Sequence, residues 1–349
     1  MKSTSPEQKI LFELLRGKLP GPGTKIDYRE LFSLLLRHRL LPLANSLLKT
    51  LPDETRSQWK NTLQQKVLRS HQLLAETLEI IGHFQEAGIR ILPLKGAVLA
   101  HTLYGDTGAR HFNDIDLLVS KEDLEKSREL LQQINYRQQY PEHLSARKWN
   151  IYSTYKKDMG FLNRDKMTFI ELHYGIYVHE LLRNRDESRI LNNTEHIAIK
   201  NTEIQVLDRE TTFVYLVYHG CLHQYFRLFW LRDVDECFKK WDMDHTKVIR
   251  LVEELGFQRL LGISLVLAKH YFGTEIPEAY SGYLADDAHI NRLVESCHKR
   301  ISTPEHLTLR TKINKHLYLA RLKPGISYKW AVLLSIFQRW RIRKFMGGH

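Results

Sequence analysis

Two aspartates, Asp114 and Asp116, stand two residues apart in the stretch HFNDIDLLV, residues 111–119. Side chains alternate across a β-strand, so a strand here places both carboxylates on one face and Ile115 on the other. Carboxylates held this close repel each other unless a cation lies between them, and hard divalent cations such as Mg²⁺ bind oxygen ligands. The pair predicts part of a metal site, and two solvated acids at a strand edge are the alternative that so short a motif leaves open.

A third carboxylate follows in MTFIELHYGI, residues 167–176, where Phe169, Glu171 and His173 alternate with apolar neighbours. Such alternation is typical of a strand. Glu171 shares a face with the two aspartates if the two strands are neighbours. His173 would lie on that same face, and we expect it to hydrogen-bond a metal-bound carboxylate or to contact the substrate.

A phosphate-binding turn is predicted upstream, in GIRILPLKGAVLAHTLYG, residues 88–105. A short apolar run ends at Lys95-Gly96 and the apolar spacing then becomes helical, so this dipeptide marks a strand-to-helix junction. A helix N-terminus attracts anions, Gly96 lets a phosphate approach the backbone, and Lys95 adds an ammonium group. A glycine that merely permits a tight turn is the alternative.

Three carboxylates on adjacent strands, with a phosphate-binding turn beside them, are the groups that two-metal nucleotidyl or phosphoryl transfer requires. One Mg²⁺ or Mn²⁺ ion would lower the pKa of the attacking hydroxyl, and a second would hold the triphosphate of an NTP co-substrate. Chemistry of this kind depends on positioning and electrostatics and needs no protein nucleophile.

The residues resemble the nucleotidyltransferase superfamily with the polymerase-beta-like fold, and within it the branch known as uncharacterised nucleotidyltransferases. The resemblance rests on LPLKGAVLA at 92–100, Arg110, NDIDLLV at 113–119, IELH at 170–173 and the histidine- and aromatic-rich segment at 216–236. The C-terminal YKWAVLLSIFQRWRIRK also resembles the closing basic-aromatic helix of that family, so the resemblance runs from about residue 80 to the end.

The resemblance implies roles for individual residues. Asp114, Asp116 and Glu171 match the metal-binding carboxylates, while nucleotide-binding positions are matched by Lys95, Gly96 and Arg110. Most members of the wider superfamily have Gly-Ser or Gly-Gly at the turn, whereas this chain has Lys-Gly-Ala, so we expect its contacts with the triphosphate to differ. The resemblance implies the reaction better than it implies the acceptor.

Two other readings of the motifs remain open. The Asp-x-Asp motif of nucleotide-sugar glycosyltransferases normally ends a hydrophobic strand, whereas here the apolar residues 117–119 follow the aspartates. A catalytically silent nucleotide- or RNA-binding module is the second alternative, and the presence of all three carboxylates and Lys95 argues against it. His219 and His223 are spaced as two zinc ligands on a helix would be, but packing or a substrate-pocket wall is the expected role.

Composition limits the class of protein. The chain has 349 residues, 43% of them hydrophobic, which suits a globular protein, and no apolar run approaches the about 20 residues that span a bilayer. The N-terminus is too polar for a signal peptide, so we expect a cytoplasmic protein. Its three cysteines lack CxxC spacing, which suggests neither a disulfide framework nor a thiolate zinc site.

The net charge of +12 would attract polyanions such as nucleic acid, nucleotides or an acidic membrane surface. Basic residues are densest at the C-terminus, where Arg339, Arg341, Arg343 and Lys344 interleave with aromatic residues, as in RNA-binding surfaces. The alternative that we favour is a basic amphipathic helix that packs its apolar residues, namely Trp330, Leu333, Leu334 and Phe337, onto the domain. We accordingly expect the acceptor to be a small molecule or peptide rather than the 3′ end of an RNA.

The order of the expected elements gives the fold class. Residues 1–86 read as an N-terminal helical region, 87–208 alternate between strand and helix, and 209–349 are again helical. We therefore predict an α+β protein in which a small mixed-sheet nucleotidyltransferase core is flanked by N-terminal and C-terminal helical regions.

Overall fold

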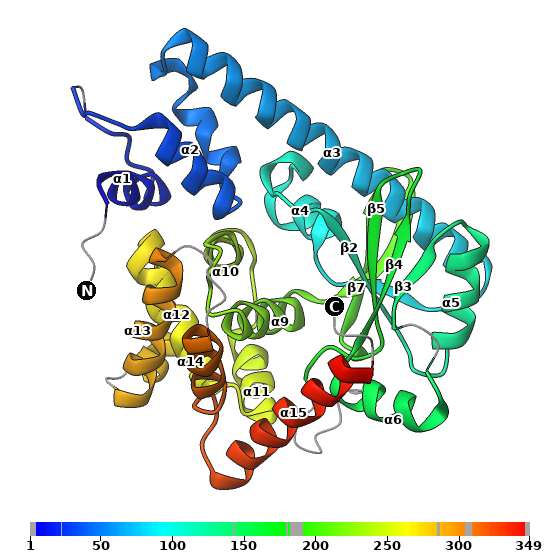
Figure 1. Ribbon diagram of the computed structural model, residues 1–349. Helices are drawn as coiled ribbons and strands as arrows, with labels where there is room; N and C mark the ends of the chain where they lie inside the picture. The colour runs from blue at the N-terminus through cyan, green and yellow to red at the C-terminus, as the bar shows by residue number, and fades with distance from the viewer. Residues whose placement is uncertain are drawn as a thin grey trace. The chain divides into compact units, whose positions relative to one another are not determined.

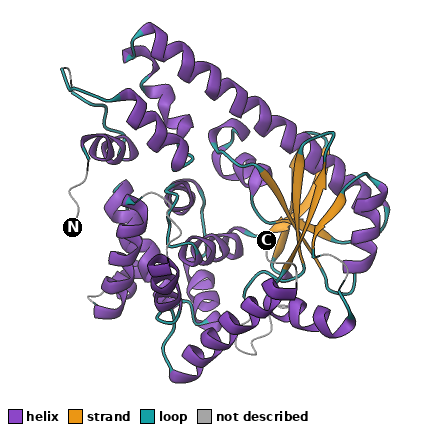
Figure 2. Cartoon of the chain, in the orientation of Figure 1, coloured by secondary structure: helices purple, strands orange, loops and turns teal. Residues whose placement is uncertain are grey.

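The computed structural model contains many helices and a small mixed sheet, and this confirms the predicted α+β class (Figures 1 and 2). The structure describes residues 5–21, 23–141, 144–178, 181, 191–284, 287–303 and 309–345.

The chain forms two compact units, each built from segments that are separated along the sequence. The first comprises residues 1–71, 100–112 and 213–308, and the second comprises residues 72–99, 113–212 and 309–349. The boundaries predicted at residues 86 and 208 remain predictions, because spatial grouping does not test where an independently folding segment begins.

A five-stranded sheet forms the centre of the second unit, with the strand order β1-β2-β5-β4-β3. Strand β2 pairs parallel with β5 and antiparallel with β1, while β4 pairs antiparallel with both β5 and β3. The strands are β1 (Ile91–Pro93), β2 (Asp114–Val119), β3 (Arg137–Tyr140), β4 (Asp158–Asn163) and β5 (Thr168–His173). The predicted neighbour relation between the Asp-x-Asp strand and the Glu171 strand is therefore present.

One face of this sheet is covered by helices. Glu76, in the second half of α3 (Asp53–Glu86), accepts hydrogen bonds from the hydroxyls of Tyr136, which directly precedes β3, and of Thr168, the first residue of β5. Helix α5 (Leu124–Gln133) follows β2, and buries Leu124 and Leu131. This unit also contains an antiparallel pair, β6 (Thr194–Ile199) and β7 (Thr202–Leu207), and helices α6 (Ala146–Tyr155), α14 (Leu309–Leu319) and α15 (Ile326–Phe345).

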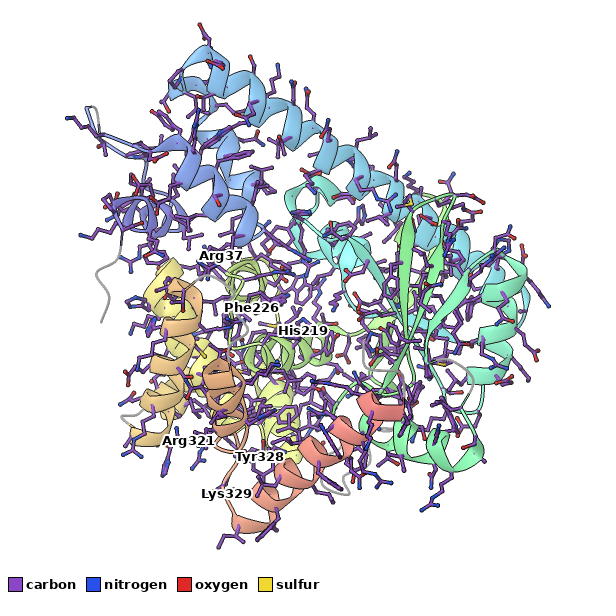
Figure 3. All side chains as sticks on the ribbon, in the orientation of Figure 1. Arg37, His219, Phe226, Arg321, Tyr328 and Lys329 are labelled. Carbon is purple, nitrogen blue, oxygen red and sulfur yellow. The ribbon has the colours of Figure 1, made fainter. Side chains whose placement is uncertain are left out.

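Helix α15 differs from the expectation. Trp330, Leu333, Leu334 and Phe337 do not pack onto the domain: they are 68%, 55%, 49% and 53% exposed. The helix instead buries its opposite face, which carries Tyr328, Val332, Ser335 and Ile342. Figure 3 marks Tyr328 at the beginning of this helix, where its hydroxyl donates to the carbonyl of Leu319. The sequence offers two apolar faces on one helix, and periodicity alone does not decide which is buried.

The first unit is helical. The Ser5 side chain caps its first helix in a reciprocal pair with Gln8. Its α-helices in the described residues are α1 (Pro6–Leu15), α2 (Tyr28–Arg37), α10 (Phe229–Lys240), α11 (His245–Leu255), α12 (Gln258–Phe272) and α13 (Ala288–Ser302). Helices α3, α4 (Gly96–Tyr104) and α9 (Arg209–Leu222) have residues in both units. Short 3-10 helices lie at Leu41–Ser46, Leu48–Thr50, Thr107–Ala109 and Glu278–Leu284.

A buried ion pair lies in this first unit. The guanidinium of Arg110 donates two parallel hydrogen bonds to the carboxylate of Asp233, at 3.0 Å from Nε to Oδ1 and 2.9 Å from Nη2 to Oδ2. The Tyr104 hydroxyl donates to the same carboxylate at 2.8 Å. Burial and the Asp233 charge raise the pKa of Tyr104 well above its usual value, so the phenol remains a donor. These contacts join residues 104–110 to α10.

We predict that Asp233→Ala lowers the free energy of unfolding by about 3–5 kcal/mol, because it leaves the buried charge of Arg110 without a partner. Glu79→Ala is the matched control: its pair with Lys166 is about half exposed, and its loss should cost less than about 1 kcal/mol. Urea unfolding of each variant measures the difference. Equal losses in the two variants would show that the Arg110 pair contributes no more than a surface pair.

Candidate active site

The candidate site is centred on Asp116, whose carboxylate is buried on the sheet face opposite to α5. Asp116 stands directly across from Glu171 in the parallel β2–β5 register, and Asp114 stands across from Phe169. Because side chains alternate, Asp114, Asp116, Glu171 and His173 belong to one face of the sheet. The structure thus brings together the residues that the sequence predicts to share a face.

Two cationic side chains contact one oxygen of Asp116. The Nζ atom of Lys95 lies 3.0 Å from Oδ1, and Nε2 of His173 lies 3.3 Å from the same atom. The side chain of Asp116 is 0% exposed, whereas those of Lys95 and His173 are 13% and 15% exposed. Among the described residues, no donor reaches the other carboxylate oxygen, Oδ2, although it is buried.

Local chain geometry explains how Lys95 reaches this carboxylate. Strand β1 runs antiparallel to β2, and the backbone N–H of Leu94 donates to the carbonyl of Asp116 at 3.1 Å. The chain therefore passes Asp116 immediately before α4 begins at Gly96. Gly96 has a φ of +69°, a left-handed conformation that a residue with a side chain adopts only under strain. The glycine allows the strand to turn into the helix while Lys95 points to the sheet.

The charges of the cluster shift each other's pKa. Burial by itself would raise the pKa of Asp116, but the charge of Lys95 and the hydrogen bond from His173 hold it well below its usual range. Burial would lower the pKa of His173, yet its hydrogen bonds to Asp116 and Glu171 raise it to about 9. Burial raises the pKa of Glu171. At neutral pH Asp116 is therefore ionised, and His173 beside it is protonated.

Asp116, Glu171 and His173 could together hold a metal ion. One oxygen or nitrogen atom from each of the three lies within 4.8 Å of the others. The orphaned Oδ2 of Asp116 fits this function, because a buried carboxylate oxygen without a donor is a site of unbalanced negative charge. Asp114 stands outside this three-residue cluster, at the beginning of β2, and its role as a metal ligand remains a prediction.

Sequence reasoning missed part of this face. Asp158 lies across from His173 on β4, and its carboxylate accepts a hydrogen bond from the Tyr140 hydroxyl at 2.9 Å. Gly160, two residues along β4 from Asp158, leaves room for two aromatic rings. A Cβ atom at this position would overlap the ring of Tyr140 and approach Cζ of Phe169 to 2.7 Å. The only signal in the sequence was a glycine within an otherwise apolar run.

The remaining predicted residues lie elsewhere. Arg110 belongs to the other unit, where Asp233 holds its guanidinium, and its nucleotide-binding role remains a prediction. His219, which Figure 3 labels, and His223 also lie in that unit. Their ring centroids are 4.8 Å apart, and they lie 5.2 and 5.0 Å from the Trp230 ring centroid. This packing agrees with the expected structural role, and the prediction that they contact substrate is untested.

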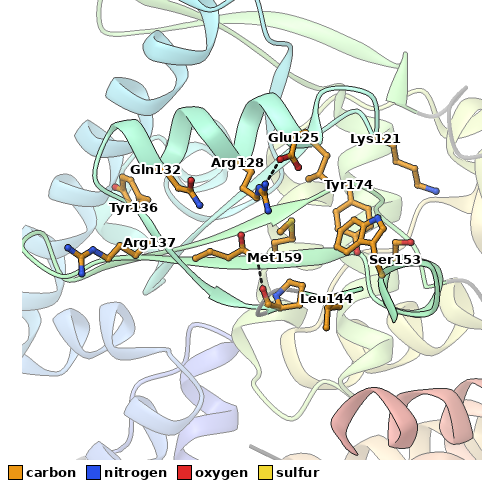
Figure 4. A pocket seen from close by; sticks show the side chains of 14 residues that line it. Lys121, Glu125, Arg128, Gln132, Tyr136, Arg137, Leu144, Ser153, Met159 and Tyr174 are labelled. Atoms are coloured by element: carbon orange, nitrogen blue, oxygen red, sulfur yellow. Dashed lines mark hydrogen bonds and ion pairs between the residues drawn. The ribbon is translucent and has the colours of Figure 1, made fainter. Parts of the chain in front are cut away.

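A cavity of about 890 Å³ opens on the opposite face of the sheet (Figure 4). Met159 and Tyr174 line it, and each is adjacent in sequence to a residue of the carboxylate face, so alternation directs them away from Asp116. Arg128, which is ion-paired with Glu125, and Trp149 contribute from α5 and α6. This cavity is therefore separate from the carboxylate cluster.

Comparison with known proteins identifies the family. The sequence model of a family described as "uncharacterised nucleotidyltransferase" matches residues 24–273. The chain belongs to this family. The match begins well before residue 80, where the sequence resemblance was expected to start, and it ends before α14 and α15. No curated protein and no solved structure matches the chain.

Membership in this family supports a general role in nucleotidyl transfer, and the carboxylate cluster lies inside the matched segment. None of the helices in the described part of the chain has both the length and the apolar character needed to cross a bilayer.

The elevated pKa of His173 predicts how stability depends on pH in metal-free protein. Below pH 6.5, the ordinary pKa, His173 is protonated in both the folded and the unfolded chain, and its stabilising effect is complete. Between pH 6.5 and about 9 only the folded chain keeps the proton, so stability falls as pH rises. The loss should reach about 3 kcal/mol at most, from about 1.36 kcal/mol per unit.

The measurement is the melting temperature from pH 6 to 9.5 in a chelator, for the native chain and for His173→Gln. Comparing the two proteins cancels the contribution of other titrating groups. The difference between their melting temperatures should shrink as pH rises across this window. A constant difference would contradict a His173 proton held by Asp116 and Glu171.

Proposed function

We propose that the chain is a metal-dependent nucleotidyltransferase that moves a nucleoside monophosphate from an NTP to an acceptor hydroxyl or phosphate. The single observation that carries the proposal is the buried Asp116 carboxylate, which faces Glu171 across parallel strands and has one oxygen without a donor. Mg²⁺ or Mn²⁺ would be held by Asp116 and Glu171, and Asp114, the first residue of β2, is the third proposed ligand.

A bound divalent cation would supply activation of the acceptor hydroxyl and neutralisation of charge on the triphosphate. The residues of the chain do the positioning. Asp116 and Glu171 are fixed by the strand register, and His173 donates to Asp116 and so restrains the orientation of its carboxylate.

Lys95 has a second part in the proposal. Its ammonium lies against the Asp116 carboxylate, at the point where α4 begins. A cation on Asp116 would replace it there, and Lys95 would then be able to contact a triphosphate near the helix N-terminus. Binding of a metal ion to Asp116 would therefore release the Lys95 ammonium for the triphosphate.

Nucleotidyl transfer is favoured over glycosyl transfer by the position of the aspartates. Asp114 is the first residue of β2, and the buried apolar residues 117–119 follow it along the strand. The glycosyltransferase motif has the opposite order, with the apolar strand before the aspartates. A small molecule or peptide remains the proposed acceptor.

The reaction class is tested by incubating the protein with α-labelled or γ-labelled NTP, Mg²⁺ and a cell extract. We expect the α-label to enter an acceptor fraction, because nucleotidyl transfer releases the β- and γ-phosphates as pyrophosphate. Asp116→Asn should lower the rate by several orders of magnitude, while the exposed Glu125→Gln should leave it unchanged. Transfer of the γ-label alone would make the protein a kinase and overturn the proposal.

Lys95→Met provides a test with two opposite effects. Mn²⁺ alone should bind more tightly, because the ammonium that competes for Asp116 has been removed. NTP binding in the presence of Mn²⁺ should weaken by about 10- to 100-fold, the worth of a hydrogen bond to a charged group. Calorimetric titration measures both affinities, and the exposed Lys121→Met serves as the control. Unchanged NTP affinity in Lys95→Met would remove Lys95 from the nucleotide site.

A further inference from the structure

Exposed apolar side chains are concentrated on the C-terminal helices α14 and α15. Eight of the eleven large apolar residues that are exposed in the described part of the chain lie between residues 313 and 340. On α15 they are Ile326, Trp330, Leu333, Leu334, Phe337 and Trp340, with exposed fractions between 49% and 73%. Their spacing of three and four residues places them on one face of the helix.

This face lies opposite to the face through which α15 packs. The buried residues Tyr328, Val332, Ser335 and Ile342 repeat with helical spacing on the other side. Helix α15 contacts α6, and the Lys148 ammonium lies 5.4 Å from the Phe345 ring centroid. The helix therefore has a packed face, and a second apolar face whose side chains remain about half exposed or more.

The same segment carries most of the net charge of the chain. Ten of its 52 basic residues and none of its 40 acidic residues lie between residues 306 and 349, so the rest of the chain is near +2. Two of these basic groups lie over aromatic rings of the exposed face: Arg341 over Phe337 at 6.0 Å, and Lys344 over Trp340 at 5.7 Å. Lys329, marked in Figure 3 at the beginning of α15, is also exposed.

We propose that α15 lies flat on an anionic lipid bilayer, with its exposed apolar face in the headgroup region and its basic side chains against the lipid phosphates. Tryptophan, phenylalanine and leucine beside arginine and lysine on a helix too polar to span a bilayer are the features of an interfacial helix. The helix ends in a cluster of positive charge, which matches the negative surface of such a bilayer.

The charge of α15 favours an anionic bilayer over a second copy of the chain as the partner. Two α15 helices paired face to face would bring two sets of basic side chains together, with no acidic residue on either helix to offset them. Nucleic acid would satisfy the charge, but the aliphatic side chains of Ile326, Leu333 and Leu334 would gain little from a phosphate backbone. A lipid surface satisfies both the charge and the apolar area.

The test uses the whole chain and vesicles of two compositions: phosphatidylcholine alone, and phosphatidylcholine with phosphatidylglycerol in equal parts. We expect cosedimentation with the anionic vesicles, decreasing as salt increases, and a blue shift of tryptophan fluorescence. The variant Trp330→Ser/Leu334→Ser/Phe337→Ser should weaken binding on the order of a hundredfold. Leu19→Ser/Leu68→Ser, which changes exposed apolar residues elsewhere, should bind like the native chain.

Removing charge gives an independent measure. Arg343→Gln/Lys344→Gln should weaken binding to anionic vesicles by about fivefold for each side chain. The exposed Lys60→Gln/Lys126→Gln pair is the control. Circular dichroism establishes that each variant is folded.

Three results would overturn the proposal. The first is the absence of binding to anionic vesicles, and the second is unchanged binding in the apolar-face variant. The third is a concentration-dependent dimer, or a complex with single-stranded RNA, that forms in preference to vesicle binding and that the apolar-face variant loses.

Discussion

The candidate site depends on one electrostatic requirement: the buried carboxylate of Asp116 needs positive charge beside it. An ionised carboxylate removed from water is costly unless it is paired and hydrogen-bonded. Lys95 and His173 meet this requirement at one oxygen, at 3.0 and 3.3 Å, while the second oxygen receives no donor from the described residues. The antiparallel register of β1 and β2 and the turn at Gly96 bring Lys95 to this charge, and the charge in turn raises the pKa of His173.

Much of the site follows from local patterns in the sequence. Alternation around Asp116 and Glu171 correctly predicts two strands with their acids on one face, and the change of periodicity at Lys95 correctly predicts a helix that begins at Gly96. These features depend only on the spacing of residues within a few positions of each other. The family match covers residues 24–273, and these motifs lie inside the matched segment.

The features that the sequence did not reveal depend on contacts between distant segments. The ion pair of Lys95 with Asp116 requires the antiparallel register of β1 and β2, and the Arg110 pair requires Asp233, 123 residues away. Strand β4 escaped notice because Gly160 interrupts its pattern, and only the three-dimensional structure shows that the rings of Tyr140 and Phe169 fill the space above it. Helix α15 has two apolar faces, so packing rather than periodicity selects the buried one.

We propose that Asp116 anchors a metal site, and that Lys95 and His173 are the cationic partners of its Oδ1 oxygen. The most direct measurement is anomalous diffraction from crystals of the protein with Mn²⁺ and a non-hydrolysable NTP. We expect an anomalous peak beside Oδ2 of Asp116 and the carboxylate of Glu171, with the Lys95 ammonium moved from Asp116 to the triphosphate. A nucleotide bound elsewhere, with no peak at Asp116 and with the Lys95 pair intact, would contradict it.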